Sequence, residues 1–231
     1  CEQYDGMDAT DLGSNAAPAV ADDGRPAVVH SEPPFVLIEP LRRTTPLIFA
    51  SPHSGRRYPA ELLADARVSL ISLRRSEDAY VDELFAGAAA HGACVLSGTI
   101  ARAYVDLNRD PAELDPEMFE ERPPHSPQSN SARVQAGLGA IPRISGDGQS
   151  IYRRKLSLSE AERRINAVHR PYHALLQNIV AETKEQFGCA VLIVADTDIL
   201  TDRLWVQATN FFGQKVLNAF ANNGDLFINA V

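Results

Sequence analysis

The sequence predicts an α/β domain, and two observations indicate this fold class. Short apolar runs alternate with segments of helical periodicity, which is typical of strands that alternate with helices. The run at 190–194 is apolar throughout, as in strands buried on both faces of a parallel sheet. With 231 residues, of which 45% are hydrophobic and 23% charged, the chain has the composition of a soluble globular protein and room for one well-buried domain with a smaller appendage.

The first elements follow in order along the chain. Residues 1–34 are rich in Asp, Ala, Gly and Pro without apolar periodicity, which predicts a flexible lead-in. The apolar run 47–50, closed by the turn 51–55, predicts a strand whose loop could carry function. Residues 73–90 place apolar side chains at helical spacing and predict an amphipathic helix.

The second half continues the alternation. We expect strands at 94–96 and 103–107, the latter ended by Pro111, and then a long loop at 116–148. A capping box formed by Ser159 and Glu162 predicts the start of the longest helix, with a kink at Pro171. The apolar strand at 190–194 follows this helix.

Charge and cysteine usage narrow the function. A net charge of -8 and a pI near 5.2 give no support for a nucleic-acid or membrane-surface partner, so small-molecule chemistry is the better expectation. The sequence has no apolar stretch long enough for a membrane span, and its first 30 residues lack a basic start followed by an apolar core. Three widely spaced cysteines fit neither a metal knuckle nor a disulfide framework, which predicts a reducing cytoplasm.

Two polar clusters could bind a metal ion. His53 lies on a tight turn at a strand end, where it could ligate a metal or act as a base, although a lone loop histidine is more often structural. Glu77 and Asp78 lie at the expected start of the helix, where favourable interaction with the helix dipole is an alternative explanation for both carboxylates.

Two further clusters could bind substrate or metal. Asn108 and Arg109 follow an expected strand and could hold a carboxylate, or could simply form a surface turn. His169 and His173 are spaced to share a helix face, as in helical zinc sites. However, Arg170 stands where the zinc-protease signature has Glu, so rings packed or hydrogen-bonded against the sheet are the favoured interpretation.

Six motifs then occur in order between Leu47 and Ile193: SPHSG followed by YP, SEDAYVDELF, ARAYVDLNRDP, GLGAIPR, IYRRKLSLSEAERRI and VHRPYH. Together they resemble the N-formylglutamate amidohydrolase, or N-formylglutamate deformylase, family. The resemblance implies a mixed, largely parallel sheet flanked by helices, related to zinc carboxypeptidases and aspartoacylases. It also implies hydrolysis of N-formyl-L-glutamate to glutamate and formate, at the end of a histidine breakdown route.

The resemblance also assigns roles to individual residues. His53 would be a zinc ligand, and a second ligand would be Asp78 or Glu77, with Asp78 preferred. Asn108 and Arg109 resemble a substrate-carboxylate clamp, and Arg102 would be a second clamp residue; no catalytic acid or base is assigned. The substrate would be an N-formyl amino acid, attacked by water that zinc activates.

The resemblance breaks at Val194, where the family would be expected to supply its last metal-binding histidine. No histidine follows His173, so the zinc site is expected to be incomplete and the domain at 35–193 C-terminally truncated. Residues 194–231 instead resemble the auxiliary component of gliding-motility-type ABC transport systems, which suggests a chimeric chain. A non-catalytic transport accessory protein and a hydrolase of another N-acyl amino acid therefore remain alternatives.

Overall fold

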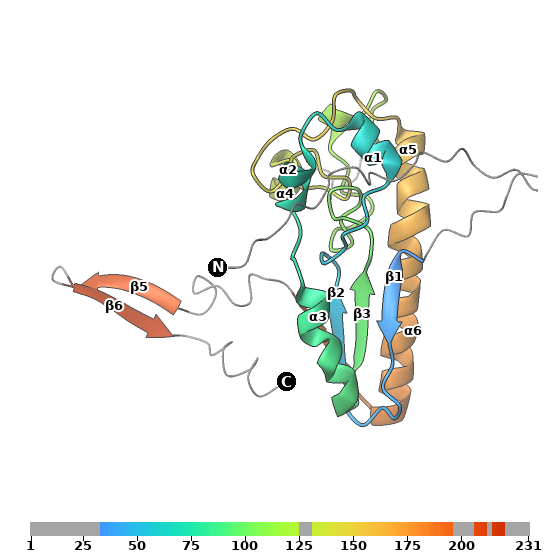
Figure 1. The fold of residues 1–231 in the computed structure, drawn as a ribbon, viewed down its shortest axis with the longest axis vertical. Helices are drawn as coiled ribbons and strands as arrows, with labels where there is room; N and C mark the ends of the chain where they lie inside the picture. Colours follow the sequence, from blue (N-terminus) through green and yellow to red (C-terminus); the bar gives the residue numbers. More distant parts are fainter. Residues whose placement is uncertain (1–32, 125–130, 196–205, 212–213, 220–231) are drawn as a thin grey trace, which may run out of the picture. The chain divides into compact units, whose positions relative to one another are not determined.

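The computed structural model describes residues 33–124 and 131–195, together with the backbone of strands at 206–211 and 214–219. One four-stranded sheet has the order β1-β3-β2-β4, with β1 at Phe35–Ile38, β2 at Leu47–Ser51, β3 at Cys94–Gly98 and β4 at Val191–Val194. β1 runs antiparallel to β3, whereas β2 is parallel to β3 (Figure 1). On its other side β2 pairs in parallel with β4. The prediction of a mixed, largely parallel sheet is confirmed.

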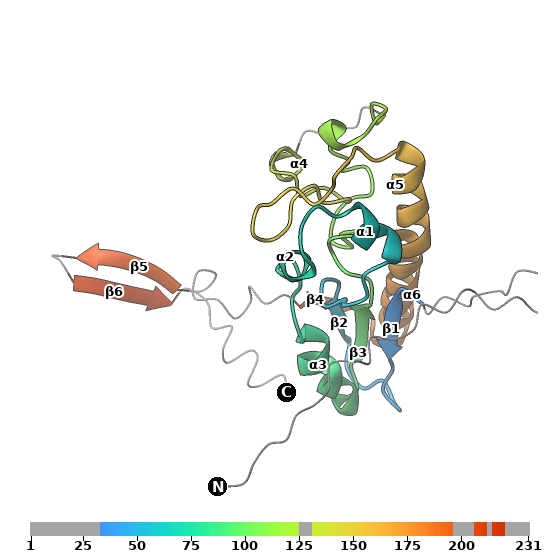
Figure 2. The ribbon, with the colours of Figure 1, turned by 45° about the horizontal axis from the view of Figure 1, so that its top comes forward.

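Short helices and one long helical rod surround this sheet. The helices are α1 (Ala60–Asp65), α2 (Leu70–Arg74), α3 (Val81–Ala86), α4 (Ala132–Gln135), α5 (Leu158–Arg164) and α6 (Arg170–Phe187), with 3-10 turns at Gly87–His91 and Pro116–Met118 and a π turn at Ile165–His169. α1, α2, α4 and their connecting loops gather beyond the carboxyl ends of β2 and β3 (Figures 1 and 2). Loops at that edge of a parallel sheet commonly form ligand sites.

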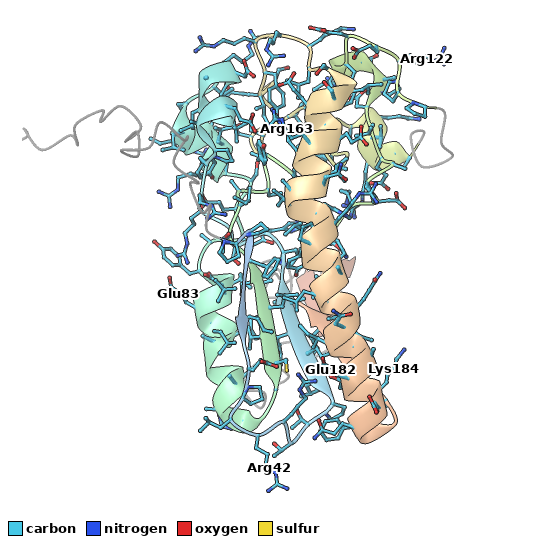
Figure 3. All side chains as sticks on the ribbon, turned by 90° about the vertical axis from the view of Figure 1, so that its right-hand side faces the viewer. Arg42, Glu83, Arg122, Arg163, Glu182 and Lys184 are labelled. Atoms are coloured by element: carbon cyan, nitrogen blue, oxygen red, sulfur yellow. The ribbon has the colours of Figure 1, made fainter. Side chains whose placement is uncertain are left out.

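Helices cover both faces of the sheet. Successive residues of a strand point to opposite faces, and the core divides accordingly. Ile48 belongs to a cluster that includes Tyr172 of α6. Phe49, one position later, belongs to a second cluster and stacks on Phe85 of α3 with ring centroids 5.1 Å apart. Figure 3 shows the strands between α3 and the long helical rod that α5, the π turn and α6 form together.

The single helix predicted at 73–90 is wrong, because the segment is broken into pieces. α2 ends at Arg74 and α3 begins only at Val81, after Tyr80 adopts a left-handed backbone with φ 64°. Glu77 and Asp78 therefore lie in the connection between two helices rather than in a first helical turn. Apolar periodicity is blind to such a break, since the core-facing positions keep their spacing across it.

The long helix begins two residues earlier than predicted. Ser157 is the N-cap, and it forms a capping box with Glu160, so the expected pair Ser159 and Glu162 is wrong. The helix then passes through the π turn just before Pro171. Proline has no N–H to donate to the preceding turn, which explains why the regular pattern changes at this point.

The strand predicted at 103–107 is also wrong. The segment is a buried turn, in which Tyr104 N–H donates to the carbonyl of Ala101 and Asp106 N–H donates to that of Ala140. Asp106 is the reason, because its carboxylate accepts a hydrogen bond from Asn108 N–H at 2.8 Å and closes a local turn.

β4 is present as predicted, but not as a strand buried on both faces. It lies at the edge of the sheet, where Val191, Leu192 and Val194 are 46%, 41% and 41% exposed. The run of apolar residues that predicted a buried strand is therefore partly open to solvent among the described residues.

The remaining expectations concern the ends of the chain. The predicted lead-in at 1–34 lies outside the described residues except for its last two positions, and β1 begins at Phe35. In the segment 194–231 the structure describes an antiparallel pair, β5 (Val206–Phe211) with β6 (Gln214–Ala219). The transport resemblance of that segment stays a prediction. Among the described residues, no helix is both long and apolar enough to span a bilayer.

Candidate active site

The candidate site is built by the loops that follow β2 and β3. His53 comes two residues after β2, on a turn in which the Ser51 hydroxyl donates to that of Ser54 at 2.8 Å. This turn packs directly on the loop after β3, because a Cβ at Gly55 would overlap the carbonyl of Ile100. Glycine is needed at this close approach, which fixes the two loops against each other.

His53 is held between two carboxylates. Its Nδ1 lies 3.2 Å from Asp78 Oδ2, and its Nε2 lies 2.8 Å from Asp106 Oδ1. The backbone adds a third point of attachment, since Asp78 N–H donates to the His53 carbonyl at 3.0 Å. The ring is 2% exposed, so its orientation is fixed by these partners.

Asp106 holds the His53 ring in place through a network of buried contacts. It is 1% exposed, and its second oxygen accepts from Arg102 Nε at 2.9 Å while Oδ1 also accepts from Asn108 N–H. Burial alone would raise the pKa of Asp106, but the hydrogen bond and charge of His53 and the charge of Arg102 lower it well below the usual range. The Asp106 side chain is therefore a buried carboxylate anion.

The same contacts act on His53 in the opposite sense. Burial would lower the pKa of His53, but hydrogen bonds to Asp106 and Asp78 outweigh it and raise the pKa. Only the imidazolium can donate to both carboxylates at once. A metal ion at Nδ1 requires that this nitrogen lose its proton, while the N–H at Nε2 stays on Asp106, as metal-binding histidines commonly require.

These residues fit part of a metal site. His53 Nδ1 and Asp78 are neighbouring donors of the types that zinc accepts. A catalytic zinc takes three protein ligands, however, and no group of three or more His, Cys, Asp or Glu side chains within 33–124 and 131–195 is arranged to hold a metal ion. A third ligand would have to come from outside these residues.

Glu77, the alternative second ligand, is engaged elsewhere. Its Oε1 accepts from the Tyr58 hydroxyl at 2.5 Å and lies 3.4 Å from Arg74 Nε. Asp78 is the acidic residue of this segment that contacts His53, whereas the Glu77 carboxylate is bound to the side chain of Tyr58. The preference for Asp78 over Glu77 remains a prediction, and this geometry agrees with it.

A cavity of about 500 Å³ opens in front of His53, which is within the usual range for small-molecule sites. Its lining includes every predicted site residue: His53, Glu77, Asp78, Arg102, Asn108 and Arg109. Arg75 and Arg133 also line it, so guanidinium groups reach the cavity from several separate loops and helices. The cavity is therefore suited to a small anion even though the chain is acidic overall.

Arg109 is only loosely held by side-chain contacts. Its Nη1 lies 3.7 Å from Glu113 Oε2, too far for a hydrogen bond, and its buried Nε has no hydrogen-bond partner among the described residues. The backbone of the same loop has firmer contacts: His169 Nε2 lies 2.8 Å from the Arg109 carbonyl, and His173 Nε2 lies 2.8 Å from the Leu107 carbonyl. The histidine pair is thus hydrogen-bonded to this loop rather than to the sheet.

Sequence reasoning missed several parts of the site. Asp106 was hidden inside an expected strand, although an acid within an apolar run beside an arginine four residues earlier signals a buried pair. The cavity wall at 144–148 lies within the predicted loop at 116–148, for which the sequence indicates no specific contacts. There the hydroxyls of Ser72 and Ser145 both donate to Asp147, at 2.8 and 2.5 Å, and fasten the loop to α2.

Comparison with known proteins identifies the family. A family model described as N-formylglutamate amidohydrolase matches residues 45–197. The chain belongs to this family. The predicted resemblance over 47–193 is thereby confirmed as an amidohydrolase relationship, and the ordered motifs around His53, Asp78 and Arg109 lie within the matched region.

Individual members of the family are similar to this chain in sequence and in fold. N-formylglutamate deformylases of Pseudomonas putida and Pseudomonas aeruginosa are each 29% identical, over 64% and 65% of this chain and 49% and 51% of their own lengths. The crystal structure of an N-formylglutamate amidohydrolase from Ralstonia eutropha JMP134 has the same fold, with a TM-score of 0.64 and 36% identity over 70% of this chain and 56% of that one. This chain spans about half the length of these members.

Proposed function

We propose that this chain carries the substrate-binding side of an N-formylglutamate amidohydrolase site, and that the complete site hydrolyses N-formyl-L-glutamate to L-glutamate and formate. The observation that carries the proposal is that one cavity is lined by His53 and Asp78 as well as by Arg102 and Arg109. A pair of candidate metal ligands that shares a cavity with carboxylate-binding side chains suits an amide whose product is an amino acid with two carboxylates.

The arginines would orient the substrate. Arg109 has a planar fork that can hold a carboxylate with two parallel hydrogen bonds, and Asn108 adds a neutral amide beside it. Arg102 uses Nε for Asp106, so its terminal nitrogens are the ones that would meet a second carboxylate. Glutamate carries two such groups, which would explain why arginines approach the cavity from several segments.

His53 and Asp78 would hold the metal ion, and Asp106 would keep the His53 ring in position. Zinc in such a site polarises a carbonyl and lowers the pKa of water. Overall, water adds to the formyl carbon, the C–N bond breaks, and the departing nitrogen gains a proton. The arrangement would be of the zinc-carboxypeptidase and aspartoacylase type, and the reaction would serve histidine breakdown. Activity would depend on a third ligand from outside the described residues.

The first experiment measures ligand binding, because binding does not require a complete catalytic site. Isothermal titration calorimetry of the purified chain with N-formyl-L-glutamate, with and without added zinc, should show saturable binding. Arg109→Ala should weaken this binding by about tenfold or more, because a hydrogen bond to a charged group contributes roughly 1.5–3 kcal/mol.

Arg42→Ala is the matched control. Arg42 is exposed at the end of the sheet away from the cavity (Figure 3). Its substitution removes the same charge as Arg109→Ala and should leave the affinity unchanged. N-acetyl-L-glutamate tests the acyl group, and N-formyl-L-leucine tests the side-chain carboxylate. Equal affinity of the Arg109 and Arg42 variants would remove Arg109 from the site, and tighter binding of the acetyl compound would favour another N-acyl amino acid as substrate.

A further inference from the structure

The loop that carries Asn108 and Arg109 has no regular secondary structure to hold it. Its position depends on specific backbone contacts. Asn108 N–H donates to Asp106, and the carbonyls on either side of Asn108, those of Leu107 and Arg109, are each 2.8 Å from a histidine nitrogen. Both carbonyls are acceptors only, so His173 and His169 must donate through a protonated Nε2.

The two histidines are arranged as a pair. Their ring centroids lie 4.2 Å apart with planes inclined by 32°. His169 is 5% exposed, and burial, the largest effect, lowers its pKa below the ordinary value. The neutral form of His169, with its proton on Nε2, keeps the hydrogen bond to the Arg109 carbonyl.

The helix departs from regular α geometry at the point where the histidine pair begins. The π turn Ile165–His169 ends at the first histidine, and α6 continues through the second. A π turn holds one more residue than a regular turn and rotates the side chains that follow it, and such turns occur frequently at functional sites. The local irregularity thus coincides with the residues that contact the loop.

We propose that His169 and His173 are positioning residues, which hold the carbonyls of Arg109 and Leu107 and so fix Asn108 and Arg109 at the cavity wall. This inference rests on the proposed function insofar as Arg109 binds a substrate carboxylate. It assigns the histidine pair the role of hydrogen-bond donors to the backbone, since both Nε2 nitrogens lie against carbonyl oxygens.

Nitrogen NMR of the full chain tests the geometry without any substrate. Both imidazoles should show a protonated Nε2, because each of these nitrogens lies against a carbonyl oxygen. In His173→Leu and in His169→Leu, the backbone amide signals of Asn108 and Arg109 should shift, whereas in the Gln variants they should stay close to wild type. Glutamine keeps an N–H donor at a similar distance from the backbone, and leucine keeps bulk without a donor.

Ligand affinity tests the consequence. Each Leu variant should bind N-formyl-L-glutamate about tenfold more weakly, as expected for loss of a partly buried hydrogen bond, and each Gln variant should recover most of the affinity. His91→Leu, at an exposed position outside the cavity lining, is the control. Its affinity should equal that of the wild type. Thermal unfolding of all variants shows whether each one is folded at the temperature of the measurement.

The outcomes separate the two proposals. If the wild-type chain does not bind N-formyl-L-glutamate, the proposed function is wrong, and the NMR signals of Asn108 and Arg109 still decide whether the histidines hold the loop. If the Leu variants leave those signals in place, or if Gln and Leu variants shift them equally, the positioning role is refuted. An unprotonated Nε2 in either ring would refute it as well, because that ring could not donate to the carbonyl.

Discussion

Replacement of Asp106 by Asn should destabilise the whole domain more than any exposed acid-to-amide change. The substitution keeps the shape of the side chain but removes a buried negative charge that accepts from His53, Arg102 and Asn108. One oxygen becomes an amide nitrogen, which has hydrogens to donate and cannot accept from either side chain. At least one cationic partner then loses its acceptor.

The size of the effect follows from burial. Asp106 is 1% exposed and His53 is 2% exposed, and breaking a buried pair by removing one partner costs about 3–5 kcal/mol. Arg102 is partly exposed and can regain water, which favours the lower end of this range. For a domain of this size, about 3 kcal/mol corresponds to a fall of roughly 6–12 °C in Tm. Differential scanning calorimetry and urea unfolding would measure it.

Asp110→Asn supplies the comparison. Asp110 is exposed, and its carboxylate accepts from the backbone N–H of Ala112, so its substitution should change the free energy of unfolding by about 0.5 kcal/mol or less. If Asp106→Asn unfolds within 1 kcal/mol of the wild type while Asp110→Asn behaves as expected, Asp106 is not the buried anchor of His53 and Arg102 described above.

Two further predictions concern the loops and the long helix. Gly55→Ala should cost about 2 kcal/mol in urea unfolding, because its Cβ meets the Ile100 backbone. Gly87→Ala, at a position with open space and a helical φ, should be neutral or slightly stabilising. Equal midpoints of the two variants would exclude the close approach at Gly55. Hydrogen bonds from Arg154 lower the pKa of Glu160 to about 2. The contribution of ionised Glu160 to the free energy of unfolding is therefore fully present above its ordinary pKa of 4.5, and it is lost as the pH falls toward 2. Glu160→Gln should therefore cost about 1 kcal/mol at pH 7, since the pair is largely solvated, and unfolding curves should converge with wild type at low pH; a constant difference would contradict this assignment.

The elements that sequence predicted well are those set by local apolar pattern. β2, β3 and β4 lie where apolar runs indicated them, and the motif residues His53, Asp78 and Arg109 meet in one cavity. The parallel arrangement explains the last result, because loops that follow neighbouring parallel strands emerge at the same edge of the sheet.

The failures arise where a long-range contact outweighs local pattern. Asp106 turns the segment 103–107 into a buried loop, because its carboxylate contacts His53 and Arg102. His53 is far away in the sequence, so a search for local apolar periodicity cannot detect this contact. Tyr80 breaks the helix predicted at 73–90, and this left-handed residue has no glycine signal in the sequence. The burial of β4 was overestimated because apolar composition does not reveal whether neighbouring strands exist.

The position of β2 within the sheet has a consequence for the rigidity of His53. β2 is paired on both sides, whereas β4 lies at one of the two edges of the sheet among the described strands. Amide hydrogens of β4 on that outer side should exchange with solvent through small local openings, while those of β2 should require much larger ones. The edge strand can therefore fray and re-form while the turn that presents the histidine to the cavity keeps its place.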